Sequence, residues 1–215
     1  MSTPTRPRAA RKSPDERTRD IVVAARDLAL EEGLAAVTLR AVAARAGVAP
    51  ALVAHYVPSM ESLIASTFAT VVGSEIAEVE TLVASLEGPP AQLGTLIRTV
   101  LDGTRDDVTV IWVEAWALGR RNESLARVVR EQMDAWQSVL QGVIEAGVGS
   151  GDFETTDASG VAWQVLGMID GLNAQALVRW GDTAHRGELT LHAVEGLLGL
   201  PRGGLDAPVA APPVA

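Results

Sequence analysis

The sequence TLRAVAARAGVAPALVAHYVPSMESLI, residues 38–64, decides the fold of this 215-residue chain. Thr38 can cap a short helix that ends at Gly47, since glycine readily adopts the left-handed conformation that closes a helix. A second short helix is expected from about Ala49, because Pro50 suits the first helical turn. Two short helices joined by a glycine turn make a helix-turn-helix, whose second helix can enter the major groove of DNA. An ordinary helical hairpin is the alternative.

Helical periodicity continues on both sides of this stretch. Apolar residues recur at helical spacing from Pro14 to Glu32, and Gly33 can close that helix. Ser59 opens a long helix that we expect to run to Leu86. Further helices are expected at about 90–102, 106–120, 123–147, 157–180 and 187–199. No stretch alternates as a strand would, so the sequence predicts an all-α protein of about nine helices.

The periodicity and composition divide the chain into four regions. Residues 1–13 are basic and lack periodicity, which predicts a disordered arm. We expect a three-helix DNA-binding domain at 14–60 and a larger helical domain for ligand binding and dimerisation at 61–200. Residues 201–215 are rich in Pro, Ala and Gly, which predicts a disordered tail.

Charge is distributed unevenly along the chain. The net charge is −9, but residues 1–60 carry nine Lys and Arg against six Asp and Glu, and the remainder carries nine against twenty-one. A basic front can neutralise DNA phosphates while an acidic body stays clear of the duplex. A chance asymmetry of surface charge would give the same counts.

The absence of cysteine excludes disulfides, thiolate metal sites and cysteine nucleophiles, and it fits a reducing compartment. Neither a signal peptide nor a membrane span is indicated, so we expect a cytoplasmic protein. A helical enzyme would need converging catalytic groups. The sequence has no His-Glu pair at metal spacing and no glycine-rich phosphate loop, so we expect no catalytic site, cofactor or metal.

The stretch 38–64 resembles the signature of the TetR family of bacterial transcriptional regulators, without a gap. The matching positions are Thr38, Ala43, Gly47, Val48, Tyr56, Ser59 and Leu63. The resemblance implies a homodimer on a palindromic operator in double-stranded DNA, most simply a repressor that a small molecule releases. Three positions depart from the family pattern: Ala49 replaces the usual helix cap, and Ala54 and Met60 replace phosphate-contacting residues. These departures also allow an alternative, a DNA-silent helical ligand-binding or interaction protein with a degenerate helix-turn-helix.

The predicted DNA-binding residues lie on and around the second helix of the motif. Apolar side chains there suit thymine methyl groups, and the polar ones can contact base edges or phosphates. Arg45 could equally be a solvated surface charge. The predicted set is Thr38, Arg40, Arg45, Ala49, Pro50, Ala51, His55 and Tyr56.

The His55–Tyr56 pair, residues 111–122 and residues 170–172 are more loosely similar to the BetI-type branch of that family. The named member of the branch responds to choline, but the ligand does not carry over because these C-terminal domains diverge. The predicted ligand-binding residues are Trp112, Trp116, Trp163, Gln164, Met168 and Asn173, with Trp136 nearby.

Aromatic walls would suit a planar ligand or a quaternary ammonium, with Glu114 or Asp170 as its counter-charge. The alternative is that these tryptophans belong to the core or to a dimer interface.

The last two helices carry apolar residues and glycines that fit a dimer seam, and the resemblance implies that two such pairs meet across a two-fold axis. The residues expected there are Val161, Val165, Ile169, Leu172, Ala176, Leu191, Val194, Leu197 and Leu198. An intramolecular core would show the same pattern.

Overall fold

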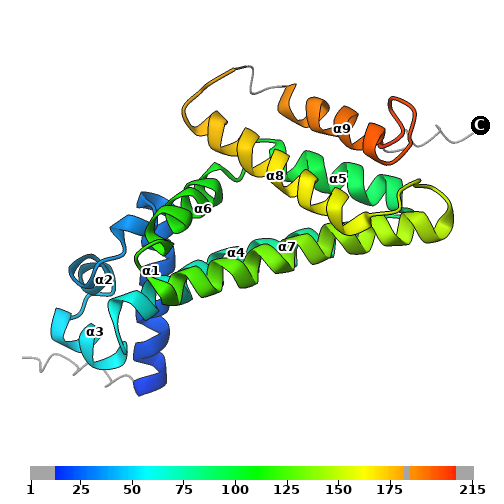
Figure 1. The fold of residues 1–215 in the computed structure, drawn as a ribbon. Coiled ribbons are helices and arrows are strands. Elements are labelled where there is room, and N and C mark those ends of the chain that lie inside the picture. The colour runs from blue at the N-terminus through cyan, green and yellow to red at the C-terminus, as the bar shows by residue number, and fades with distance from the viewer. Residues whose placement is uncertain (1–12, 182–184, 207–215) are drawn as a thin grey trace, which may run out of the picture.

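A computed structural model describes residues 13–181 and 185–206, and within those ranges it contains nine α-helices, one short 3-10 helix and no strand (Figure 1). The predicted all-α class is confirmed. The expected helices differ from the observed ones by at most three residues at either end. The basic arm predicted at residues 1–13 lies outside the described residues, except for Ser13.

The N-terminal bundle consists of α1 (Pro14–Glu32), η1 (Leu34–Ala36), α2 (Leu39–Arg45) and α3 (Pro50–Tyr56). A capping box opens α1, since the Ser13 hydroxyl accepts from the Glu16 N–H and the Glu16 carboxylate accepts from the Ser13 N–H. Ile21, Leu28 and Leu34 are buried in the core of this bundle. Short helices are thus fixed by local caps and a small shared core.

The body consists of α4 (Met60–Ala84), α5 (Pro89–Leu101), α6 (Asp106–Gly119), α7 (Glu123–Ser150), α8 (Ala158–Leu177) and α9 (Arg186–Leu197). The long helices α4 and α7 pack side by side along the length of the molecule, and α5, α8 and α9 pack over their far half (Figure 1). Helix α6 returns from that half to the N-terminal bundle, where it contacts α1 and η1. The body and the bundle are therefore joined through both α4 and α6.

Helix α4 is the central helix of the core. Among the described residues it is the one helix long and apolar enough to cross a membrane, yet half of its apolar window is buried inside the fold. Phe68, Val72 and Val79 on its inner face are fully buried. Its apolar character is explained by packing against α1, α5, α6 and α7.

The predicted disorder of the tail from residue 201 is wrong for its first six residues. Residues 201–206 turn back over α5 and α9, and Leu205 is fully buried. The Glu195 carboxylate accepts from the N–H groups of Gly203 and Leu205 at 3.0 and 3.2 Å, and Arg98 donates to the Leu205 carbonyl at 3.1 Å. A single apolar anchor and paired backbone groups overcome the composition of this segment. Residues 207–215 lie outside the described ranges.

Most residues expected at a dimer seam are buried within the protomer. Those on the inner faces of α8 and α9 are Val161, Val165, Ile169, Leu191, Val194 and Leu198, each less than a tenth exposed. The outer faces of these helices instead expose Trp163 and Leu189, at 67% and 60%. The apolar pattern thus reflected the intramolecular core that the sequence left open as an alternative.

Candidate DNA-binding surface and ligand cavity

The helix-turn-helix is built by one cap and one glycine. The Thr38 hydroxyl accepts from the Ala41 N–H at 3.3 Å at the start of α2. Gly47 has φ +65°, and the chain reverses there so that the Val48 N–H donates to the Ala43 carbonyl at 2.9 Å. Ala43 and Val53 are buried where α2 meets α3. The turn therefore holds the outer face of α3 toward solvent.

The predicted DNA-binding residues lie on one end of the molecule. Thr38, Arg40, Ala49, Pro50, Ala51 and His55 are exposed, and Tyr56 is half-buried. The rings of His55 and Tyr56 meet edge to face with centroids 5.2 Å apart. These residues belong to α2, α3 and the residues that cap them, and both helices lie at one end of the molecule, next to the start of α4 (Figure 1).

Arg45 is bonded to α1 instead of standing free. Its guanidinium donates to both carboxylate oxygens of Glu31, at 2.8 and 2.6 Å, and lies 3.7 Å from Glu32. This bidentate bond raises the pKa of Arg45 and lowers the pKa of Glu31. Arg45 thus ties α2 to α1, which fits its alternative interpretation as a surface charge.

The start of α3 lacks a side-chain cap, as its sequence predicts. Ala49 occupies the N-cap position and makes no side-chain hydrogen bond. At the start of α4, Ser59 and Ser62 cap each other's N–H groups, at 3.0 and 3.2 Å. Met60 beside them is half-buried against the core. Residues 49–60, which include α3 and the first residue of α4, contain no Lys or Arg, so cationic side chains are scarce on this surface.

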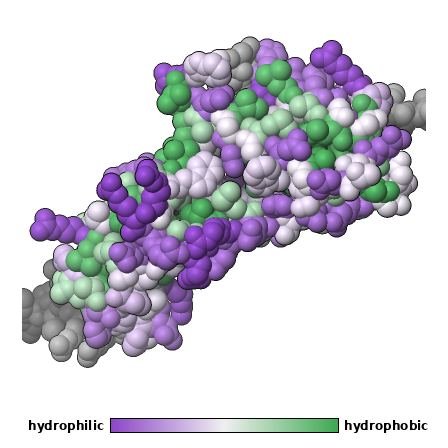
Figure 2. Space-filling model, viewed as in Figure 1, coloured by the Kyte–Doolittle hydropathy of each residue, from purple (hydrophilic) through white to green (hydrophobic). Residues whose placement is uncertain are grey.

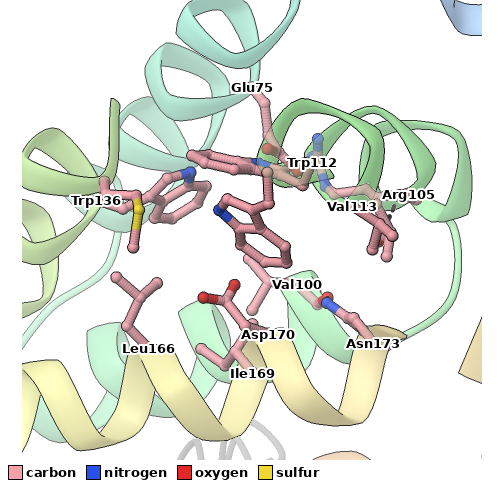
Figure 3. A pocket seen from close by; sticks show the side chains of 13 residues that line it. Glu75, Val100, Arg105, Trp112, Val113, Trp136, Leu166, Ile169, Asp170 and Asn173 are labelled. Atoms are coloured by element: carbon pink, nitrogen blue, oxygen red, sulfur yellow. Dashed lines mark hydrogen bonds between the residues drawn. The ribbon is translucent and has the colours of Figure 1, made fainter. Parts of the chain in front are cut away.

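A cavity of about 50 Å³, the tryptophan cavity, lies in the body between α4, α6, α7 and α8 (Figure 3). Trp112 and Trp116 come from successive turns of α6, with ring centroids 5.7 Å apart, and Trp136 faces them from α7. Phe68 packs edge to face on Trp112 at 5.0 Å. The lining residues are Glu75, Val100, Arg105, Thr109, Trp112, Val113, Trp116, Met133, Trp136, Leu166, Ile169, Asp170 and Asn173.

Two carboxylates enter this cavity from opposite walls. Glu75 comes from α4 and Asp170 from α8, and Asp170 points toward the indoles in Figure 3. Burial raises the pKa of Asp170 to about 6. Burial also raises the pKa of Glu75 to about 7, although Arg105 and a hydrogen bond with Trp112 oppose that shift. The lining of the cavity therefore combines two carboxyl groups and three indole rings with a single arginine.

Arg105 is the one cation in the lining, and it also lines a neighbouring hollow. It pairs with Glu78 at 3.3 Å, and its Nε atom is buried with no hydrogen-bond partner within the described ranges. Arg105 and Glu75 also line a second, more open hollow between α1, α4 and α6. Their side chains thus separate the tryptophan cavity from that hollow.

The structure brings some of the predicted ligand-binding residues together and separates others. Trp112, Trp116 and Asn173 line the tryptophan cavity, where Asn173 also donates to the Val100 carbonyl at 3.0 Å. Trp163 and Gln164 lie on the exposed outer face of α8, and Met168 borders a shallow hollow with residues of α9. These three do not reach the tryptophan cavity.

Sequence reasoning missed Glu75 and Arg105. A signal for Glu75 exists, because it stands in the apolar stripe of α4 between Val72 and Val79, at helical spacing. A charged residue in such a stripe faces the core and calls for a partner or a function. Arg105 precedes α6 and carries no comparable pattern.

Glu114 connects the helix of the tryptophans to the N-terminal bundle. Its carboxylate accepts from the Ala35 N–H in η1 at 2.9 Å. Glu114 therefore points away from the tryptophan cavity, and Asp170 is the one of the two predicted counter-charges that lines it. Gly33 lies directly beneath, with φ +90°, and a Cβ atom there would lie 2.8 Å from the carboxylate. Glycine adopts this φ without strain and leaves the Glu114 carboxylate in place. Helix α6 therefore faces the cavity on one side and the bundle on the other.

Two family models match consecutive parts of the chain. Residues 21–67 match the model of bacterial regulatory proteins of the tetR family, and residues 89–199 match that of the BetI-type transcriptional repressor, C-terminal. The second match covers about half of the chain. No curated protein matches significantly.

Solved structures with the same fold include three instructive cases, all of low sequence identity. A transcriptional regulator of Saccharomonospora viridis in complex with choline has a TM-score of 0.76 at 21% identity, covering 86% of this chain and 98% of that one. A TetR-family regulator of Rhodococcus sp. has 0.72 at 17%, covering 86% and 99%. The regulator FadR of Bacillus subtilis, in complex with stearoyl-CoA, has 0.66 at 19%, covering 84% and 98%.

Proposed function

Because the chain belongs to the TetR family of bacterial transcriptional regulators, we propose that it is a cytoplasmic repressor that a compact organic cation releases from its operator. The domain boundary proposed from the sequence, at residues 60 and 61, places DNA binding in the N-terminal bundle and ligand binding in the body. The observation that carries the ligand class is the tryptophan cavity with the half-buried Asp170 in its wall.

The chemistry of the cavity favours a cation. An indole face attracts a positive charge through its quadrupole, and the attraction strengthens when the cation is desolvated. Within the described residues no cation lies at ion-pair distance from Asp170, and burial alone accounts for its raised pKa. A bound ammonium group would supply the missing counter-charge. The choline held by the Saccharomonospora viridis regulator is a ligand of this class.

The volume of the cavity limits the size of that cation. With about 50 Å³ free, a compact cation requires less displacement of the surrounding side chains than an acyl chain such as that of the stearoyl-CoA bound by FadR. A ligand must displace the side chains around it, and α6, which carries two of the tryptophans, is placed to respond. Its other face holds η1 through Glu114 and Ala35. A shift of α6 would therefore change the position of α2 and α3 relative to the body.

We propose that the dimer forms through the outer faces of α8 and α9. Trp163 and Leu189 are exposed there, and the positions of Gly167 and Gly171 are open enough for a second helix to approach closely. A two-fold axis through this surface presents two N-terminal bundles to DNA, which matches a palindromic operator.

The first test is a titration of the purified protein with the duplex that flanks its own gene, at two salt concentrations, with random duplex as control. Tight, salt-sensitive and selective binding is expected, followed by release on addition of choline or tetramethylammonium as probe cations. Equally weak binding to both duplexes would contradict the repressor and favour a DNA-silent ligand-binding protein. Binding without release by either cation would contradict the ligand class alone.

A further inference from the structure

The surface formed by α3 and the start of α4 is poor in positive charge. Residues 50–56 and 60–63 contain no Lys or Arg, and Glu61 adds a negative charge. Arg45 is bonded to Glu31, so Arg40 is the remaining arginine of the helix-turn-helix. Phosphate contacts supply much of the affinity of proteins for DNA. Besides the basic N-terminal residues, cations of the body that lie near this surface could therefore add to the affinity.

The turn between α6 and α7 lies beside the start of α4. Helix α6 passes η1 at Glu114 and continues for about 9 Å, at 1.5 Å per residue, to the turn that contains Arg120 and Arg121. Asn122, the next residue, donates its side-chain N–H to the Glu61 carbonyl in the first turn of α4 at 3.4 Å. Helices α4 and α7 thus begin side by side, at the end of the body nearest the N-terminal bundle (Figure 1).

Arg120 and Arg121 are exposed and have no acidic partner among the described residues. The nearest acid along the chain, Glu123, is bonded to Arg130 at 2.8 Å. Figure 2 shows hydrophilic side chains gathered where α6 ends and α7 begins. Two adjacent guanidinium groups repel each other and add nothing to packing, whereas a polyanion would satisfy both.

We propose that Arg120 and Arg121 contact DNA phosphates beside the start of α4, so that the body itself takes part in operator binding. The proposal rests on the DNA-binding function proposed above. It also places a phosphate contact directly on the end of α6, the helix that carries two walls of the tryptophan cavity. Displacement of α6 by a ligand would then move these arginines together with α2 and α3.

The test compares R120Q, R121Q and the double variant with R202Q, which removes the same charge at the opposite end of the body. Fluorescence anisotropy on operator and random duplex between 50 and 300 mM KCl measures affinity and its salt dependence. The double variant should bind both duplexes about tenfold or more weakly. Its salt slope should fall by about 1 for each contacting arginine in each protomer. R202Q should match the wild type.

An unchanged affinity and slope in the double variant, with normal wild-type binding, would overturn this inference and leave the proposed function intact. Absence of salt-sensitive wild-type binding would instead overturn the proposed function. The variant R120K/R121K keeps the charges and should keep the salt slope, which separates phosphate contact from a folding defect. A slope lost in the lysine variant, with its thermal melting unchanged, would also contradict phosphate contact.

Discussion

The N-terminal bundle places the side chains proposed for DNA binding on exposed helix faces, whereas the body places those proposed for ligand binding on inward faces. In the bundle, Thr38, Arg40 and His55 are exposed, and the small residues Ala43 and Val53 form the interior. In the body, Glu75 and Asp170 face inward among tryptophans. Exposed charges act through many weak contacts that salt screens, whereas a buried charge acts strongly on one partner. Substitutions should therefore have graded effects in the bundle and large effects in the body.

The largest effect is expected from Asp170→Asn. Loss of the buried counter-charge should weaken binding of choline or tetramethylammonium at least about 30-fold, or about 2 kcal/mol. Wild-type affinity for the cation should rise as the pH increases from 5 to 7, because the carboxylate form binds and the pKa of Asp170 is about 6. In the variant the part of this rise centred near pH 6 should be absent, and Glu75, with a pKa of about 7, is the remaining carboxyl group that titrates in the cavity. Tryptophan fluorescence measures both, and Asp134→Asn, on the exposed face of α7, is the control. Equal affinities for wild type and D170N would remove Asp170 from the ligand site.

The next effect concerns stability and Glu75. Folding raises the pKa of Glu75 from 4.5 to about 7, so between these values the folded state holds a proton that the unfolded state releases. The free energy of unfolding therefore falls as the pH rises through this window. Glu75→Gln avoids the loss and should be about 2–3 kcal/mol more stable than the wild type at pH 8, with little difference near pH 4. Urea unfolding at several pH values measures this, with Glu80→Gln as the exposed control. A difference that does not change with pH would contradict the buried carboxyl.

A smaller effect is expected at the link between the two regions. Glu114→Ala removes the hydrogen bond to the Ala35 N–H and leaves the cavity side of α6 intact. Ligand binding and DNA binding should each persist, but the factor by which the cation lowers operator affinity should fall about fivefold, or about 1 kcal/mol. The measurement is operator affinity with and without saturating cation, with Glu80→Ala as control. Undiminished coupling would mean that the signal passes through α4 instead.

An effect of similar size, but on DNA affinity alone, is expected at the DNA-binding surface, from Met60→Lys. A lysine at the start of α4 can keep its stem on the core and place its ammonium group near phosphates. Binding to operator and random duplex should tighten by about fivefold, or about 1 kcal/mol, and the salt slope should steepen by about 1 per protomer. The anisotropy titrations described above test this. A change confined to the operator would argue for base contact and against phosphate contact.

The sequence predicted the helices and the helix-turn-helix because their signals are local. Thr38, Gly47 and Ser59 each determine a cap or a turn within a few residues. The spacing of Trp112 and Trp116 likewise placed both on one face of α6. Glu114, two residues after Trp112, lies on the opposite face of α6 by the same geometry. The helical spacing could therefore have predicted that Glu114 points away from the tryptophans.

The outward faces of α8 were not predictable in this way. Apolar residues lie on several sides of that helix and its few polar residues are scattered, so periodicity does not distinguish its core face from an interface. Trp163 and Met168 were therefore placed in the cavity, and Val165 and Ile169 at the dimer seam. The correct faces depend on where α5, α7 and α9 pack, which is a property of the whole fold.

Gly33 gives this regulator a position where function can be lost without damage to either binding site. It lines neither the candidate DNA-binding surface nor the tryptophan cavity, yet its φ of +90° disfavours any other residue, and a Cβ atom there would displace the Glu114 carboxylate. In genetic terms, a missense change of this codon should strain the backbone at φ +90° and displace the Glu114 carboxylate from the Ala35 N–H, which weakens the link between α6 and η1. A selection for cells that no longer respond to the effector should therefore recover codon 33 alongside the codons of the tryptophan cavity.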